Sequence, residues 1–398
     1  MIETKFKETG VGLVPEDWVV KKLANVVEVK RGVRVTRNNL SNNGLYPVYQ
    51  NTNYPMGFYN KFNVNENNPF VIIGGSAGLL GYSKTKFWAA DDCAYFGDSN
   101  KLDKGFLYYN LLNRQQEIKN CVKTGTVPRL DRSSLEVFQL ILPPTLSEQR
   151  RIASALSSVD SLISNLDTLI EKKRNIKQGA MQQLLTGKTR LKGFDEPWVE
   201  KKLGEIGYTY NGLTGKSASD FGSGNASYIT FLNILNNVRI DTRILGKVDV
   251  ESTEKQNAVQ KGDLFFNTSS ETPEEVGICS VLLEDIAITY LNSFCFGYRI
   301  VDTEVLGLYL SYYFRSEKGR QLMSFLAQGS TRYNLSKDSF IKSSICIPAT
   351  LSEQSAIASI LTSMDDEIAK LEQKREKYVA LKQGMMQQLL TGKIRLTD

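Results

Sequence analysis

Basic and hydrogen-bonding side chains gather in loop-rich stretches of both halves of this 398-residue chain. Arginine pairs with guanine, asparagine with adenine and serine or threonine with either base, while lysine meets phosphates. These residue types in loops predict contacts with DNA, although ordinary solvated loops have the same composition. The candidate contacts are Arg31, Arg34, Arg37, Gly75, Ser76, Lys84 and Arg129 in the first half, and Lys216, Asn267, Thr268, Ser269, Ser270 and Arg332 in the second.

The composition argues against catalysis by this chain. It has no histidine, which removes the usual general base of Ser-His-Asp or Cys-His sites and the commonest transition-metal ligand. Its five cysteines form no Cys-x-x-Cys pair, so we expect neither a zinc knuckle nor a disulfide framework. The glycine-rich run 74–81 lacks the Gly-Lys-Ser/Thr of a phosphate loop, and residues 67–70 match a base-flipping methyltransferase motif only in part. We therefore predict no catalytic residue, no metal site and no cofactor in this chain, and the net charge of +6 permits a polyanionic partner.

The chain contains an internal repeat. Residues 145–149 return as 350–354, and residues 177–191 return as 382–396 with thirteen of fifteen positions identical. A further echo, Trp18 to Leu23 against Trp198 to Leu203, precedes each copy at a shorter offset. The order is therefore A-B-A′-B′, and we predict recognition domains at 1–144 and 193–347 that alternate with helices at 145–192 and 348–398.

The repeated block predicts a long helix. Thr145-x-x-Glu148 and Thr350-x-x-Glu353 follow proline-containing turns as capping boxes, and Gly187 and Gly392 stand where a C′ glycine ends a helix. Each helix would be about 60 Å long. Apolar residues alternate at spacings of three and four, the period of a coiled-coil seam. The seam residues are Leu156, Val159, Ile163 and Leu166 in the first copy and Leu361, Met364, Ile368 and Leu371 in the second.

Two arrangements can bury these seams. The helices can pair with each other, antiparallel, or each can pack on its own globular block; the strict 3.5-residue period favours pairing. Gly179 and Gly384 are unexpected in helix interiors, where glycine costs about 1 kcal/mol against alanine. They suggest a docking surface used twice, with simple recent duplication as the alternative. The residues that we assign to this surface are Met181, Leu184, Leu185, Met386, Leu389 and Leu390.

The two variable blocks have the pattern of α+β domains. Short β-type runs at 70–73, 137–142, 263–266 and 343–347 are separated by loops rich in Asn, Gly and Ser, and one amphipathic helix is expected in each block, at 105–121 and 306–326. The predicted fold class is therefore α+β, with two loop-rich domains separated by two long antiparallel coiled-coil helices.

From end to end, the chain resembles the specificity subunit of type I restriction-modification systems. The segments that carry the likeness are 15–23, 71–78 with Phe87, Trp88 and Asp91, 126–130, 143–149, 182–187, 192–198 and, for some members, 268–277. The resemblance implies a non-catalytic subunit whose two recognition domains each read half of a split double-stranded DNA target. Its helices would dock two methyltransferase subunits, and restriction subunits would join them. S-adenosylmethionine, ATP and magnesium would then belong to those partners.

Two other classes of function remain open. A fused methyltransferase or nuclease would need catalytic motifs that the sequence lacks, and a coiled-coil adaptor would bind no nucleic acid. No apolar run approaches the ~18 residues of a membrane span. The amino terminus lacks a signal-peptide core, and we expect a cytoplasmic protein without membrane contact.

Overall fold

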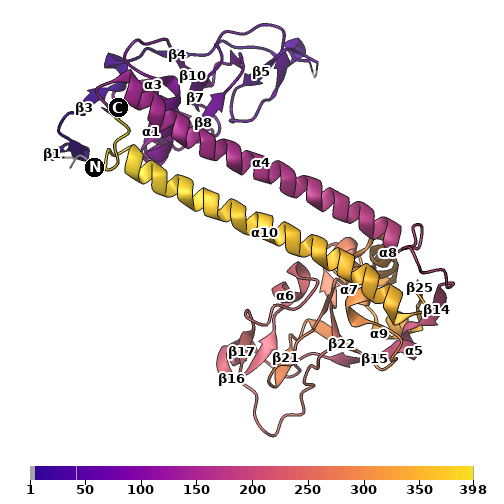
Figure 1. The fold of residues 1–398 in the computed structure, drawn as a ribbon. Helices are drawn as coiled ribbons and strands as arrows, with labels where there is room; N and C mark the ends of the chain where they lie inside the picture. Colours follow the sequence, from indigo (N-terminus) through magenta and orange to yellow (C-terminus); the bar gives the residue numbers. More distant parts are fainter. Residues whose placement is uncertain (1–4, 42, 398) are drawn as a thin grey trace. The chain divides into compact units, whose positions relative to one another are not determined.

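The computed structural model describes residues 5–41 and 43–397. It divides into two compact units. The first unit combines residues 1–168 with residues 372–398, and the second unit comprises Leu169–Leu371. Each unit therefore takes one half of both long helices, α4 (Leu146–Leu184) and α10 (Leu351–Leu389), together with one globular domain (Figure 1). Within the described residues, no helix is long and apolar enough to cross a membrane.

The globular part of the first unit is built on a four-stranded antiparallel sheet in the order β4 (Val29–Arg31), β10 (Cys93–Phe96), β7 (Asn68–Ile72), β8 (Leu80–Ser83). A smaller sheet has the order β6 (Gly57–Tyr59), β5 (Tyr46–Tyr49), β9 (Trp88–Ala89), and β3 (Val19–Lys22) pairs with β13 (Gln139–Leu142). The remaining elements are β1 (Phe6–Thr9), β2 (Gly12–Pro15), α1 (Lys104–Asn113), α2 (Gln115–Asn120), β11 (Val122–Lys123), β12 (Arg129–Leu130) and α3 (Arg132–Glu136).

The second unit repeats this topology. Its four-stranded sheet has the order β15 (Gly207–Asn211), β22 (Cys295–Ile300), β18 (Leu264–Asn267), β20 (Cys279–Val281). Its smaller sheet is β17 (Gly246–Val248), β16 (Phe221–Ile229), β21 (Thr289–Leu291), and β14 (Val199–Lys202) pairs with β25 (Ser344–Ile347). The other elements are α5 (Leu203–Ile206), α6 (Phe231–Asn236), β19 (Ser269–Ser270), α7 (Gly307–Arg315), α8 (Glu317–Leu326), β23 (Ala327–Gln328), β24 (Tyr333–Leu335) and α9 (Lys337–Lys342).

Matching hydrogen bonds show which positions of the two sheets are equivalent. Gly32 N–H donates to the Cys93 carbonyl at 2.8 Å, and Gly212 N–H donates to the Cys295 carbonyl at 3.3 Å. Cys93 stands opposite Ile72 in the first sheet, and Cys295 stands opposite Asn267 in the second. The internal repeat of the sequence is therefore also a repeat of the fold, although the globular blocks share little sequence.

The halves of α4 and α10 that share a unit run antiparallel. In the first unit Lys382 meets Asp160 at 2.6 Å and Arg375 meets Asp167 at 2.5 Å, so one helix ascends as the other descends. In the second unit Lys173 meets Glu367 at 2.7 Å and Lys177 meets Asp365. Every predicted seam residue of both helices is buried or half-buried. The helix-pairing prediction is confirmed, and the packing of the helix ends on the globular cores accompanies it.

Both predicted capping boxes are half correct. The Thr145 and Thr350 hydroxyls accept from the backbone N–H of Glu148 and Glu353 at 3.2 and 3.4 Å. The glutamate carboxylates do not reach back to the cap: Glu148 binds Arg395, which follows the end of α10, and Glu353 binds Arg190, which follows the end of α4. Gly187 and Gly392 end the two helices with φ of +71° in each case, as predicted.

The four predicted β-runs are strands, but the amphipathic helix expected in each block is broken in two. The breaks fall at Arg114, between α1 and α2, and at Ser316, between α7 and α8. Ser316 has extended dihedrals and its side chain accepts from Gly319 N–H, so it caps a new helix instead of continuing the first.

Candidate nucleic-acid interface

In the first unit, a glycine-rich loop leads from β7 into β8. Gly75 N–H donates to the Pro128 carbonyl at 3.1 Å and Ser76 N–H donates to the Asn51 carbonyl at 2.9 Å. Gly75 has φ of +83°, and a Cβ there would lie 2.8 Å from the Asn51 Cβ. Left-handed backbone and close approach of a neighbouring loop therefore account for this glycine, without any bound phosphate.

The loop lies against the exposed hairpin between β11 and β12. Gly74 and Arg129 form a bridge, and the Arg129 side chain is 61% exposed with one nitrogen 3.3 Å from Asp92. Arg31 donates from Nε to the carbonyl of the adjacent Asp91 at 2.8 Å. Gly75, Ser76, Arg31 and Arg129 are thus brought together from segments far apart in the sequence.

The second unit builds the same arrangement with different side chains. Thr268 N–H donates to the Phe294 carbonyl at 3.0 Å. The equivalent bond in the first unit runs from Ile73 N–H to the Asp92 carbonyl at 2.8 Å. Leu335 N–H then donates to the Thr268 carbonyl at 2.9 Å, as Leu130 N–H does to that of Ile73. The loop after β18 and the hairpin between β23 and β24 border a cavity of about 710 Å³. It is lined by Phe231, Leu235, Asn267, Ser269, Ser270, Glu271, Glu275, Thr331 and Arg332.

Four of the predicted contacts therefore fall on equivalent segments of the two units, namely Gly75 and Arg129 in the first and Ser270 and Arg332 in the second. Ser270 occupies the position of Gly75, since Ser269 pairs with Asn334 as Gly74 pairs with Arg129. Arg332 is exposed in the hairpin at the position of Val127, which is 51% exposed. The same fold thus presents different residues at equivalent positions of its two copies.

Two predicted contacts, Asn267 and Lys216, need correction, and a third, Lys84, lies apart from the others. Asn267 is fully buried: its amide donates to the carbonyls of Ser269 and Glu275, and its Oδ1 accepts from Ile278 N–H, so it organises the loop. Lys216 is 7% exposed and paired with Glu254, which leaves it unable to meet a phosphate in this conformation. Lys84 is exposed, but it follows the far end of β8 from the glycine-rich loop.

The other predicted residues differ in exposure. Arg34 and Arg37 are exposed on the segment after β4. Thr268 donates its hydroxyl to the Phe294 carbonyl at 2.7 Å, and Ser270 donates to Glu275 at 3.0 Å. Ser269 is 8% exposed, so of the hydroxyls in this run those of Thr268 and Ser270 are the more accessible.

Arg320 on α8 is a functional candidate that the sequence reading missed. Its guanidinium donates to the carbonyls of Glu274 and Gly277 at 2.9 Å each and to that of Val276. Burial, together with the nearby Arg315, lowers the pKa of Arg320 to about 10, so it remains charged at neutral pH. Arg320 fixes the end of the loop that carries Thr268 and Ser270, and nothing in the sequence around it marks an arginine with that role.

The docking surface predicted on the helices is wrong in its residues. Leu184 and Leu185 pack in the core of the second unit with Leu203 and Leu361. In the first unit, the set Met386, Leu389 and Leu390 packs in the core with Trp18, Phe106 and Leu156. Leu185 is 0% exposed, and Met181 is half-buried against the same core. These side chains complete the chain's own domains and are not available to a partner.

A different face of the repeated segment is open. Gly179 and Gly384 are exposed, and a Cβ at either position would meet nothing within 4 Å. One turn before them lie Ile176 and Leu381, 47% and 50% exposed at equivalent positions of the two helices. Close packing inside the chain therefore explains neither glycine, and the exposed face is duplicated.

The comparisons with known proteins agree with this architecture. The family model described as "Type I restriction modification DNA specificity domain" matches twice, over residues 15–175 and 195–380. The chain therefore belongs to this family, as the sequence resemblance indicated.

Individual relatives extend the likeness over the whole chain. The Type I restriction enzyme MjaVIII specificity subunit of Methanocaldococcus jannaschii is 28% identical over 100% of this chain and 97% of its own length. The crystal structure of the S subunit of a type I restriction-modification system from M. genitalium has a TM-score of 0.67 at 18% identity, covering 97% of this chain and 98% of that one. A chain solved in work on complex assembly and conformational transition of the type I R-M system has a TM-score of 0.53 at 14% identity, covering 96% and 99%. At these sequence identities the two solved structures are evidence for the fold alone.

Proposed function

We propose that this chain reads a bipartite double-stranded DNA target, with one globular domain for each half-site, and that it carries no catalysis itself. The observation that supports this most directly is the repeated frame with different loop residues. Gly75 in the first unit and Ser270 in the second stand at equivalent loop positions, and Arg129 and Arg332 stand on equivalent hairpins. Two similar frames with different contact residues can read two different sequences, whereas a catalytic site would need the same residues in each copy.

The partners follow from the family. The chain would dock two methyltransferase subunits and, through the assembled complex, restriction subunits. S-adenosylmethionine, ATP and magnesium would be bound by those subunits. We place the docking contacts on the exposed face of the repeated segment, at Ile176, Gly179 and Gln183 in α4 and at the equivalent Leu381 and Gly384 in α10, with the half-buried Gln388 beside them.

The test is the pattern of methylation in a host that carries the chain with its methyltransferase. Arg129→Ala should relax the sequence requirement in one half-site, and Arg332→Ala should relax it in the other. Each lost base contact is worth about 1–3 kcal/mol of discrimination. Long-read sequencing of methylated bases measures both half-sites at once. If either substitution altered both halves, the two domains would not be independent readers.

A protein–protein adaptor without nucleic acid is the alternative. Both classes predict assembly with partners, but the DNA reader alone predicts binding whose logarithm falls linearly with the logarithm of the salt concentration. Fluorescence anisotropy with a labelled duplex, measured at several salt concentrations, separates the two classes.

A further inference from the structure

The two units differ at one edge of their repeated sheets. In the second unit the outer edge of β20 is covered by a segment of the chain itself. Val281 N–H donates to the Val238 carbonyl at 3.0 Å, and Ile240 N–H donates to the Val281 carbonyl at 2.9 Å. Arg239 pairs with Val281 in a parallel bridge. Residues 238–240 thus add a short parallel strand to the sheet.

The corresponding edge in the first unit is β8, and Tyr82 is the residue equivalent to Val281. Tyr82 stands opposite Pro69 and Val281 stands opposite Leu264, at matching positions of the repeated sheets. Ile72 exchanges backbone hydrogen bonds with the chain leading into β8, so by alternation Phe70 and Gly81 face each other and Tyr82 directs its N–H and C=O outward. Across residues 5–41 and 43–397 no hydrogen bond to the outward groups of Tyr82 appears.

The connection that covers the edge in the second unit is shorter in the first. Residues 230–245 join β16 to β17, whereas residues 50–56 make the equivalent connection between β5 and β6. The short loop reaches the start of β8, where Asn53 donates to the Leu80 carbonyl at 3.2 Å. It leaves the edge beyond that point, at Tyr82, uncovered.

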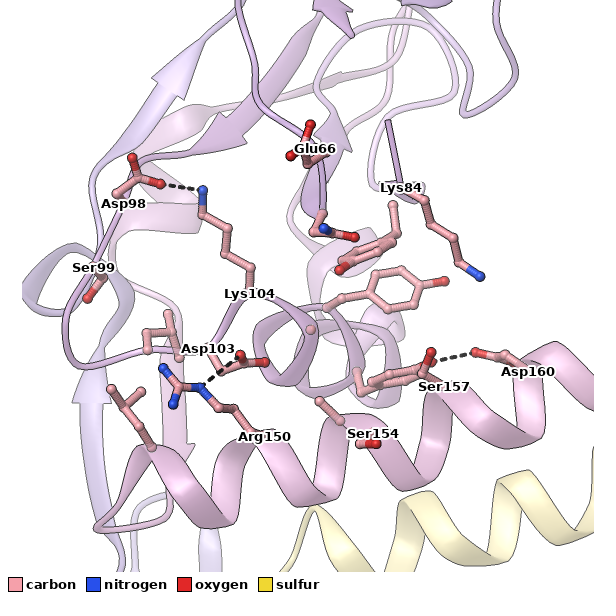
Figure 2. Close-up of a pocket in the computed structure, with 18 residues that line it drawn as sticks. Glu66, Lys84, Asp98, Ser99, Asp103, Lys104, Arg150, Ser154, Ser157 and Asp160 are labelled. Atoms are coloured by element: carbon pink, nitrogen blue, oxygen red, sulfur yellow. Dashed lines mark hydrogen bonds and ion pairs between the residues drawn. The ribbon is translucent and has the colours of Figure 1, made fainter. Parts of the chain in front are cut away.

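A cavity of about 700 Å³ occupies the uncovered position, between this edge and α4 (Figure 2). Tyr82, Tyr108 and Asp160 line it. Their counterparts in the second unit surround the added segment. Ser311, at the position of Tyr108 on the equivalent helix, donates to the Val238 carbonyl at 2.8 Å. Arg239 pairs at 2.6 Å with Asp366, which directly follows the counterpart of Asp160.

The walls of the cavity suit an extended peptide. The Tyr82 and Tyr108 rings lie 5.1 Å apart and offer apolar surface. On the α4 wall, Ser154 and Ser157 offer hydrogen-bond acceptors, whereas the Asp160 carboxylate already accepts from the Tyr109 hydroxyl at 2.7 Å and pairs with Lys382 (Figure 2). Lys104 is neutralised by Asp98 at 2.6 Å, so it is not a free cation for an anionic ligand.

We propose that the outer edge of β8 is a binding site for an extended segment of a partner polypeptide, which adds to the sheet as a parallel strand. The fitting segment has apolar residues on either side of a polar one, at the positions of Val238, Arg239 and Ile240 in the second unit. No positive charge is required at the central position, because Ser161 stands on α4 where Asp366 of α10 pairs with Arg239. Backbone hydrogen bonds to Tyr82 give the affinity, and the side chains of alternate residues meet the tyrosines and the α4 wall. This site is independent of the DNA-reading loops, because the glycine-rich loop lies at the opposite end of β8.

The test uses a synthetic peptide with the sequence of residues 235–243, titrated into the full chain. We expect saturable binding and a shift of the Tyr82 amide resonance, with the Val281 amide unchanged. Methylation of the backbone nitrogen at the position of Ile240 removes the donor to the strand and should weaken binding at least tenfold. The same methylation at the position of Arg239, whose N–H points away from the sheet, should leave affinity nearly unchanged.

Two protein variants complete the test. Tyr82→Pro removes the outward N–H of an edge position together with the tyrosine ring and should abolish binding, whereas Tyr82→Phe keeps both the N–H and the ring and should bind like the unaltered chain. Any of three results overturns the proposal. The first is no saturable binding up to about 1 mM peptide, a dissociation constant that corresponds to a binding free energy of ~4 kcal/mol. The second is equal affinity of the two methylated peptides, and the third is a shift of the Val281 amide resonance in place of that of Tyr82. The peptide arms keep the test valid should Tyr82→Pro fold poorly.

Discussion

At the scale of single residues, each of the near-identical repeated segments carries an arginine that binds a buried glutamate of the same unit. We call each of these ion pairs, Arg395–Glu148 and Arg190–Glu353, a clasp. In the first unit Arg395 binds the Glu148 carboxylate through two nitrogens at 2.7 and 2.9 Å and also binds Asp17. In the second unit Arg190 binds Glu353 at the same two distances. Each arginine also lies near a tryptophan ring, with Arg395 over Trp18 at 5.5 Å and Arg190 over Trp198 at 6.0 Å. The side chains of Glu148 and Glu353 are each 2% exposed, so each clasp is a largely buried ion pair.

Breaking one clasp should destabilise one unit only. Glu148→Ala removes the buried partner of Arg395 and leaves it only Asp17, whose side chain is half exposed. We expect a loss of about 2–3 kcal/mol, slightly below the cost of leaving a buried charge with no partner. Hydrogen exchange should report the loss in the first unit, and Glu353→Ala should produce it in the second. Asp167→Ala is the matched control: its pair with Arg375 is half exposed and should contribute less than about 1 kcal/mol. Equal loosening of both units by Glu148→Ala would contradict the clasp.

Arg320 gives a second prediction at this scale. Arg320→Met keeps the length of the side chain but leaves the carbonyls of Glu274, Val276 and Gly277 without their donor. We expect a loss of about 1–3 kcal/mol in the second unit. Amide exchange in the loop should be faster, and discrimination should weaken in one half-site. Lys318→Met on the exposed face of the same helix should change none of these. If amide exchange in this loop were unchanged in Arg320→Met, the order of the loop would not depend on Arg320.

The sequence predicted that the candidate contact residues lie in loops and turns, but it could not predict which protein groups their side chains already bind. Gly75, Arg129, Ser270 and Arg332 fall on equivalent loops because loops and strands follow from local pattern. Asn267 was predicted to contact a base, but its side-chain amide already forms hydrogen bonds with neighbouring backbone groups. The sequence states that an amide is present but not whether the fold has already satisfied it.

At the scale of elements, α4 and α10 carry two separate surfaces on one repeated sequence. The apolar residues around Leu184 and Leu389 close the cores, and the glycines at 179 and 384 lie exposed. Amphipathic spacing predicted that these leucines are covered, but spacing cannot say whether the cover is a partner or the chain's own domain. The seam, by contrast, was predictable because its 3.5-residue period has one common explanation.

Substitution of the exposed glycines should raise the stability of the helices and weaken assembly with the methyltransferase. Gly179→Ala and Gly384→Ala should each stabilise the helix by about 0.5–1 kcal/mol, because alanine loses less backbone freedom on folding. If the face docks the methyltransferase, the added methyl groups should at the same time weaken assembly, and Gly179→Leu should weaken it further. Thermal unfolding and the stoichiometry of the assembled complex measure the two effects. Unchanged assembly with leucine at both positions would move the docking surface elsewhere.

At the scale of the whole molecule, the first domain is completed by a segment that lies far from it in sequence. The first unit draws Met386, Leu389 and Leu390 into its core from the last part of the chain, and Arg395 follows them. Their exposed fractions are 9%, 5% and 2%. The sequence revealed that the two segments repeat, but the A-B-A′-B′ order predicted domains ending at residue 144. Contacts between positions so distant in the chain leave no local pattern.

Removal of residues 386–398 should therefore unfold the first unit and spare the second. Three apolar side chains lose burial worth about 2 kcal/mol each, and the total is comparable to the 5–15 kcal/mol that stabilises a domain. Limited proteolysis should then cleave within residues 5–144 while residues 193–347 stay intact. A synthetic peptide of residues 382–397, added separately, should restore protection of the first unit, whereas the same peptide with Arg395→Ala and Leu390→Asp should not. Lys393→Ala, an exposed substitution in the same segment, serves as the control in the full chain. A truncated protein whose first unit resists proteolysis as before would show that the carboxyl-terminal segment is not part of that core.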